Sequence, residues 1–158
     1  NIIQVFDPIY HQKIEDDQPE VLSLTKQSGY DRRWFRCKRP FIVTGGDEES
    51  FERSKAGTRQ QIAFYGSTPA YRGVLEIHGW GGLQDELNTL SKQGKWVEMG
   101  NLIDDEILNT FAVVGEPETI APELHRRYGD VIQRISFYAP YKSDPERWAT
   151  VLEALKSA

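Results

Sequence analysis

The sequence predicts an α/β fold in which short parallel strands alternate with helices. Residues 40–46, PFIVTGG, form an apolar segment that ends in a glycine turn, as expected of a buried strand. Residues 131–140, VIQRISFYAP, are rich in branched and aromatic residues and predict a second strand. Helical periodicity dominates the sequence between and after these two segments. Two apolar strands joined by helices favour parallel pairing.

The first 39 residues are the least regular part of the chain. Residues 1–6, NIIQVF, predict a short strand before an Asp-Pro turn, and residues 19–29 predict a helix between Pro19 and Gly29. Residues 30–40 interleave five basic residues with Trp34 and Phe35. This pattern fits either a nucleic-acid-binding patch or a loop with solvated charges, and the acidic remainder of the chain favours the loop.

The region from residue 47 to residue 111 predicts several consecutive helices. Asp47 is a suitable N-cap, and Gly66 predicts the end of the first helix. Its inward stripe is predicted to comprise Phe51, Thr58, Ile62 and Tyr65. Thr68 and Pro69 then predict a new helix start, and Gly94 predicts a later stop. The later inward positions are predicted to be Ala70, Val74, Ile77, Leu83, Leu87, Leu90, Ile103, Ile107 and Phe111, and Trp96 and Met99 are predicted to anchor a short turn.

Two further helices are predicted near the end of the chain. The first opens at Pro117 and ends at Gly129, and Pro122 is tolerated because it lies in the first turns. The second starts at Pro145 after an Asp144 cap. Its apolar face is predicted to comprise Trp148, Val151, Leu152 and Leu155.

Size and composition restrict the class of protein. A chain of 158 residues with 39% hydrophobic and 27% charged residues fits one globular domain. The net charge of −5 argues against a nucleic-acid partner, and the apolar runs are shorter than the roughly 18 residues of a membrane span. A single cysteine excludes an internal disulfide, and the sequence shows no signal peptide. We therefore expect a cytoplasmic protein with no membrane association.

Several long sequence segments resemble the C-terminal part of the bacterial luciferase-like monooxygenases. They are PFIVTG, RQQIAFYGSTPAYRGVLEIHGWG, ELNTLSKQGKWVEMGNLIDDEILNTFAVVGEPETI and RYGDVIQRISFYAP, in this order. The branch they are most similar to is the actinobacterial oxidoreductases that depend on the deazaflavin coenzyme F-420. The resemblance covers residues 40–158, whereas residues 1–39 match poorly.

The resemblance implies the C-terminal portion of an eight-stranded (β/α) TIM barrel. Phe41 to Thr44 would be strand seven, Ile132 to Tyr138 would be strand eight, and residues 47–111 would form a helical excursion near the barrel mouth. The barrel is incomplete in this chain. The implied cofactor is coenzyme F-420, or alternatively FMN, with a small-molecule substrate.

The helix break at residues 65–80 holds the residues that we expect to line a substrate or cofactor pocket. Barrel enzymes place their sites at the carboxyl ends of the strands, which the resemblance assigns to this region. The candidates are Tyr65, Thr68, Tyr71, Arg72, His78 and Trp80. Aromatic faces would stack on a flavin-like ring, and Arg72 would hold an anionic group. The alternative is ordinary capping and packing.

Other chemical signals are weaker. The helix start at Gly115 and Glu116 could hold a phosphate, although the acidic residues there oppose it. His78 could act as an acid or base, but its neighbours do not have metal-ligand spacing, so we expect no metal. No catalytic base is assigned, because the earlier strands of the family fold have no counterpart in this sequence.

Two functions follow. The chain is part of a luciferase-like oxidoreductase that carries out hydride transfer or monooxygenation and is inactive as a fragment alone. Alternatively, it is a non-catalytic half-barrel that associates with itself or with another chain, because an incomplete parallel sheet exposes an edge. In both cases we expect a homo-oligomer.

Overall fold

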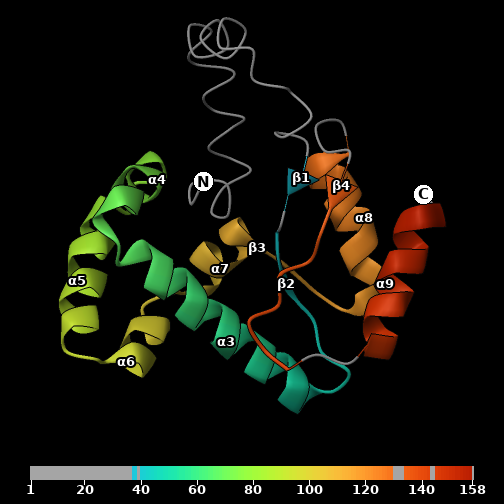
Figure 1. The fold of residues 1–158 in the computed structure, drawn as a ribbon, viewed down its shortest axis with the longest axis horizontal. Coiled ribbons are helices and arrows are strands. Elements are labelled where there is room, and N and C mark those ends of the chain that lie inside the picture. The colour runs from blue at the N-terminus through green and yellow to red at the C-terminus, as the bar shows by residue number, and fades with distance from the viewer. Residues whose placement is uncertain (1–36, 39, 130–133, 143–144, 158) are drawn as a thin grey trace, which may run out of the picture.

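A computed structural model describes residues 37–38, 40–129, 134–142 and 145–157. The predicted strand at residues 1–6, the predicted helix at residues 19–29 and the side chains of the basic segment 30–39 lie outside the described part. The described elements, in chain order, are β1 (Cys37–Lys38), β2 (Phe41–Val43), α3 (Glu48–Gly66), the 3₁₀ turn η3 (Pro69–Tyr71), α4 (Arg72–Ile77), α5 (Gly81–Lys92), α6 (Trp96–Asn101), α7 (Asp105–Phe111), β3 (Ala112–Val114), α8 (Pro117–Tyr128), β4 (Arg134–Ile135) and α9 (Pro145–Ser157). Figure 1 shows this arrangement.

The strands pair in parallel, as predicted. β2 pairs with β3, with Phe41 opposite Ala112, and β1 pairs with β4. Beyond β4, Tyr138 bridges Phe41: the N–H of Ile42 donates to the Tyr138 carbonyl at 3.2 Å. The backbone of β2 therefore lies between β3 and the segment around Tyr138.

β3 is a strand that the sequence interpretation missed. Residues 112–114 follow α7 directly, and three apolar residues after a helix give too short a signal to separate a strand from the last helical turn. The strand predicted at residues 131–140 is shorter than expected among the described residues. It is paired at Arg134–Ile135 and again at Tyr138.

Helices cover both faces of these strands. Phe41, Val43 and Ala112 belong to a core that includes residues of α3 to α7. Ile42 and Val113, which point the opposite way, belong to a second core with α8 and α9. This burial on both faces explains why β2 and β3 are continuously apolar rather than alternating. The result is a mixed α/β structure, mostly helical, around short parallel strand pairs.

α3 begins as predicted. The Asp47 carboxylate accepts from the Ser50 N–H at 2.6 Å, and the Ser50 hydroxyl oxygen accepts from the Asp47 N–H at 3.1 Å, which makes a capping box. The predicted inward stripe is confirmed at Thr58 and Ile62, which are buried, while Phe51 and Tyr65 pack partly buried against the core.

Gly66 ends α3, but not for the predicted reason. The next residue, Ser67, is right-handed, so no left-handed glycine cap forms. A Cβ on Gly66 would lie 2.9 Å from Leu87 Cδ1, and the glycine therefore allows α5 to approach closely. Gly94, with φ of 69°, does provide the predicted left-handed stop after α5.

Most of the predicted core positions are confirmed. Val74, Leu87, Ile103, Ile107, Phe111 and Val151 are buried. Ala70 and Leu152 were predicted to point inward and are exposed, because the neighbouring Tyr71 and Val151 take the inward positions instead. Of the two residues predicted to anchor a short turn, Met99 is buried and Trp96 is exposed.

Candidate functional site

The break between α3 and α4 gathers aromatic side chains, as the sequence suggested. The rings of Tyr65 and Tyr71 meet edge to face with centroids 5.9 Å apart. His78 stacks on Trp80 at 4.9 Å and meets Phe111 edge to face at 5.6 Å. Four of the six candidate residues therefore make aromatic contacts at the break: Tyr65 with Tyr71, and His78 with Trp80. These contacts are consistent with packing and provide faces of the kind that stack on planar ligands.

Burial changes the titration of the two tyrosines in this group. Burial raises the pKa of Tyr65, and its hydroxyl contact with Tyr138 raises it further. Burial also raises the pKa of Tyr71. Both phenols are therefore neutral hydrogen-bonding groups at neutral pH and not bases.

The other two candidates, Thr68 and Arg72, are not aromatic and make different contacts. Thr68 occupies the N-cap position before Pro69, as predicted, but it is exposed and its hydroxyl makes no cap hydrogen bond. Arg72 donates to the carboxylates of Glu76 and Asp85, each at 2.8 Å. These two hydrogen bonds raise the pKa of Arg72, the one to Glu76 most. An anionic ligand at Arg72 would have to compete with both carboxylates.

The aromatic group does not lie at the carboxyl end of β2, where the sequence interpretation expected the site. At the start of α3, the Ser54 hydroxyl donates to the Thr44 carbonyl, just past the carboxyl end of β2, at 2.9 Å. Near its end, the Tyr65 ring contacts Phe41, the first residue of β2, with centroids 6.4 Å apart. α3 thus runs back along β2, and it places Tyr65 and Tyr71 towards the amino end of the strand rather than the expected carboxyl end.

The carboxyl end of β2 carries polar residues that the sequence interpretation did not single out. The Tyr141 hydroxyl donates to the Ile42 carbonyl at 2.7 Å, and Ser54 is 2% exposed. Burial raises the pKa of Tyr141. The signal that could have identified Tyr141 is Pro140, because a proline at the end of a strand cannot donate to its neighbour.

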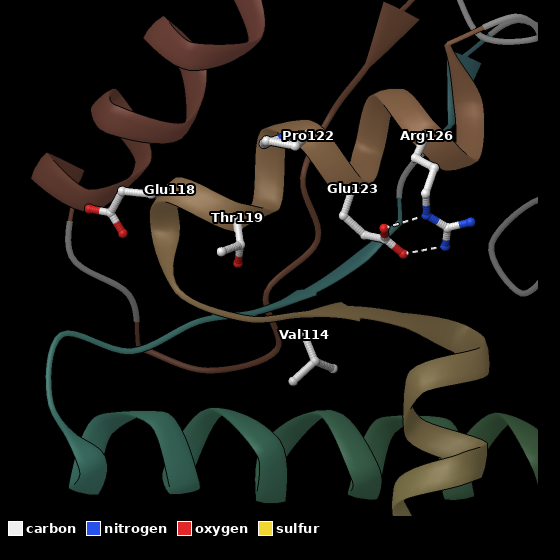
Figure 2. A pocket seen from close by; sticks show the side chains of 6 residues that line it. All are labelled: Val114, Glu118, Thr119, Pro122, Glu123 and Arg126. Carbon is white, nitrogen blue, oxygen red and sulfur yellow. Dashed lines mark hydrogen bonds and ion pairs between the residues drawn. The ribbon is translucent and has the colours of Figure 1, made fainter.

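Gly115 and Glu116 lie at the N-terminus of α8, as predicted. Glu116 is the N-cap residue without a side-chain cap bond, and its carbonyl accepts from the Thr119 hydroxyl at 2.8 Å. An open cavity of about 410 Å³ lies beside this helix (Figure 2). Glu118, Glu123 and Arg126 line the cavity, so two carboxylates and one cation lie close to the predicted phosphate position.

Glu123 is held in a tight ion-pair network on α8. Both carboxylate oxygens accept from Arg126 at 2.6 Å, and Arg127 donates to one of them at 2.6 Å. Hydrogen bonding to Arg126, followed by Arg127, lowers the pKa of Glu123 to about 2. The Arg127 guanidinium also donates to the Ala112 carbonyl at 3.1 Å, which ties α8 to β3.

The described residues contain no cluster of three or more histidine, cysteine, aspartate or glutamate side chains able to hold a metal ion. Among the helices that the structure describes, none is long and apolar enough to cross a membrane.

Comparisons with known proteins identify relatives of this chain. The family model described as luciferase-like monooxygenase matches residues 32–134. Uncharacterized proteins of Mycobacterium bovis and of two strains of Mycobacterium tuberculosis are each 50% identical over 118 residues. The match covers 74% of this chain and 35% of each relative, so the chain spans about a third of the length of these curated relatives. No solved structure matches significantly.

Proposed function

Because the chain belongs to the luciferase-like monooxygenase family, we propose that it forms part of an oxidoreductase that uses coenzyme F-420 or FMN. The family match over residues 32–134 is the observation that carries this proposal. In such enzymes the cofactor supplies the redox chemistry, while the protein binds and orients it against a small-molecule substrate and excludes water.

We further propose that the described strands are a section of the family's barrel. The parallel pairing of the described strands supports this, because neighbouring barrel strands are parallel. Their order differs from that of consecutive barrel strands, in which β3 would lie between β2 and the segment around Tyr138. β3 then occupies the other flank of β2, so a strand that extends the sheet on that side must pair with β3.

Within this proposal, the aromatic group at the helix break remains the candidate contact for the cofactor or substrate. Because it lies towards the amino end of β2, the ligand would bind at the end of the strands opposite to the usual barrel site. The rings of half-buried His78 and Trp80 stack with their planes 24° apart, and a planar ring could extend that stack. Arg72 is the proposed contact for an anionic substituent, and the N-terminus of α8 at Gly115 and Glu116 is a second one.

Fluorescence and absorbance titrations with F-420 and with FMN test the cofactor proposal. The protein is used both as this chain and as the full-length Mycobacterium tuberculosis relative. We expect binding by the full-length relative. In this chain, Trp80→Phe should weaken binding and the control Trp148→Phe should leave it unchanged, since Trp148 packs in the separate core with α8 and α9. Absence of binding to either cofactor by the full-length relative would refute the proposal.

The second candidate function is a non-catalytic module that associates with itself. The observation that favours it is an exposed apolar group on α3 and α6, in which Phe64 and Trp96 contact each other and Val97 is 65% exposed. Light scattering at high concentration tests it. A clean monomer that binds cofactor would exclude this function.

A further inference from the structure

Aromatic side chains form a continuous series of contacts from the first residue of β2 to the surface of α6. Phe41 of β2 contacts Tyr138 and Tyr65, with ring centroids 5.3 and 6.4 Å away. Tyr65 contacts Phe64 at 5.8 Å, and Phe64 contacts Trp96 at 6.3 Å. We refer to Tyr138, Tyr65, Phe64 and Trp96 as the aromatic series.

The two ends of the aromatic series lie in different environments. Phe41 is 1% exposed, and Tyr65 and Tyr138 pack partly buried against the core that contains it. Phe64 and Trp96 are each 49% exposed. The series therefore connects two partly buried phenols with an indole that is open to solvent.

The packing of α6 along α3 joins the two ends of the series (Figure 1). Phe64 and Tyr65 are consecutive residues of α3, so one helix supplies both rings. A Cβ on Gly100 would lie 2.9 Å from Gln60 Cγ, so this glycine of α6 allows the two helices to approach closely. Trp96 lies one turn before Gly100 and Phe64 one turn after Gln60, so the same approach brings their rings into contact.

The side chains of the series differ in their redox chemistry. Phenol and indole rings can each lose a single electron, whereas the phenyl ring of Phe64 can only bridge them. A phenol that loses an electron also loses its proton and therefore needs a hydrogen-bond acceptor. Burial raises the pKa of Tyr65, and the hydrogen bond between its hydroxyl and that of Tyr138 raises it further, as expected when Tyr65 is the donor.

We propose that the aromatic series carries single electrons between Tyr65 and the protein surface at Trp96. A one-electron oxidant at the surface removes an electron from the Trp96 indole, whose Nε1 proton passes to water. Tyr65 then donates an electron across Phe64 to the Trp96 radical, which recovers a proton from water. The Tyr65 proton passes to the Tyr138 oxygen, and the half-buried Tyr138 releases its own proton to water. The net change is one electron transferred from Tyr65 to the oxidant and one proton released.

The same contacts serve the opposite direction. An oxidised Tyr65 takes an electron from Trp96 and its proton back from Tyr138, and a reductant in solution, such as a thiolate, then reduces Trp96. The series thus gives an oxidising equivalent inside the protein a route to the surface. This inference goes beyond the proposed function, because it needs no bound F-420 or FMN.

Flash photolysis of this chain tests the inference. Val97 is 65% exposed beside Trp96, so Val97→Cys in a Cys37→Ser background can carry a ruthenium(II) polypyridyl label. A flash in the presence of a soluble electron acceptor converts the label to the ruthenium(III) oxidant. Transient absorbance distinguishes tryptophanyl from tyrosyl radicals. In this labelled parent we expect the tryptophanyl signal first and a tyrosyl signal that grows as the tryptophanyl signal decays.

Three variants of the labelled parent locate the route. Tyr65→Phe keeps the ring and removes the phenol, so the tyrosyl signal should be lost and the tryptophanyl radical should persist. Phe64→Leu removes the bridging ring and should lower the yield of the tyrosyl radical. Tyr71→Phe is the matched control, because the Tyr71 ring contacts Tyr65 at 5.9 Å but is outside the series, and both signals should remain. If circular dichroism shows that Tyr65→Phe is unfolded, Phe64→Leu decides, because Phe64 is exposed.

Three results would overturn the inference: no tyrosyl radical in the labelled parent, the same tyrosyl yield in Tyr65→Phe and Phe64→Leu as in the parent, or a tyrosyl signal that survives unchanged in Trp96→Phe. The last result would mean that the label oxidises tyrosine without Trp96. A chain that shows the transfer but binds neither F-420 nor FMN would leave the inference standing and would count against the proposed function alone.

Discussion

The hydrogen bond to the Ile42 carbonyl at the end of β2 leads to a prediction that can be tested in detail. The Tyr138 N–H donates to the Pro40 carbonyl, and the Ile42 N–H donates to the Tyr138 carbonyl, both at 3.2 Å. In a parallel pair the next donor to the Ile42 carbonyl would be the N–H of residue 140. Residue 140 is proline and has no N–H, and the Tyr141 hydroxyl donates to this carbonyl instead, at 2.7 Å.

A Tyr141→Phe variant should therefore be measurably less stable. Ile42 is 0% exposed, and a buried carbonyl that loses its partner costs about 1–3 kcal/mol. The aromatic ring remains, so little of this cost comes from packing. For a chain of this length, a loss of about 1.5 kcal/mol lowers the melting temperature by roughly 3–6 °C.

A double-mutant cycle separates this explanation from a general effect of the hydroxyl. Pro140→Ala restores an N–H where the ladder needs one, so that Tyr141→Phe should cost less than about 0.5 kcal/mol in the Pro140→Ala background. The free energy of unfolding is measured by urea titration for the wild type and the three variants. An equal cost of Tyr141→Phe in both backgrounds would refute the reasoning.

Two other predictions follow from individual contacts. A Cβ on Gly45 would lie 2.5 Å from the backbone nitrogen and Cα of Phe51, so Gly45→Ala should destabilise the fold by about 2 kcal/mol or more. Gly82 lies in open space on α5, so Gly82→Ala should stabilise the fold by up to about 1 kcal/mol. Both free energies of unfolding are measured by the same urea titration. The pKa of Glu123 falls from 4.5 to about 2 on folding, so its stabilising contribution is complete above pH 4.5 and is lost as the pH falls towards 2. Thermal unfolding should show Glu123→Gln about 1 kcal/mol less stable than the wild type at pH 7, and the difference should disappear only as the pH falls below about 2. A pH-independent difference would contradict the pKa argument.

The local structure of the chain could be predicted from its sequence because the signals are local. Asp47 and Ser50 form the cap of α3 from two residues three positions apart, and Gly94 ends α5 through its own backbone freedom. The apolar residues 41–43 and the spacing of Leu87, Ile103 and Ile107 likewise determined a buried strand and inward helix faces. The family, too, could be identified from ordered phrases of sequence alone, and the family match confirms it.

Contacts between distant residues needed the tertiary structure. β3 is a strand only because β2 lies beside it, and Gly66 matters because Leu87, 21 residues later, packs against it. The direction in which α3 crosses β2 decides that Tyr65 lies by Phe41, and no property of residues 48–66 by themselves encodes that direction. Tyr141 and Arg127 complete strand edges formed by residues 99 and 15 positions away, so their roles emerge only when the chain is folded. Periodicity records which side of an element is apolar, whereas the identity of the neighbour is fixed by the packing of all elements together.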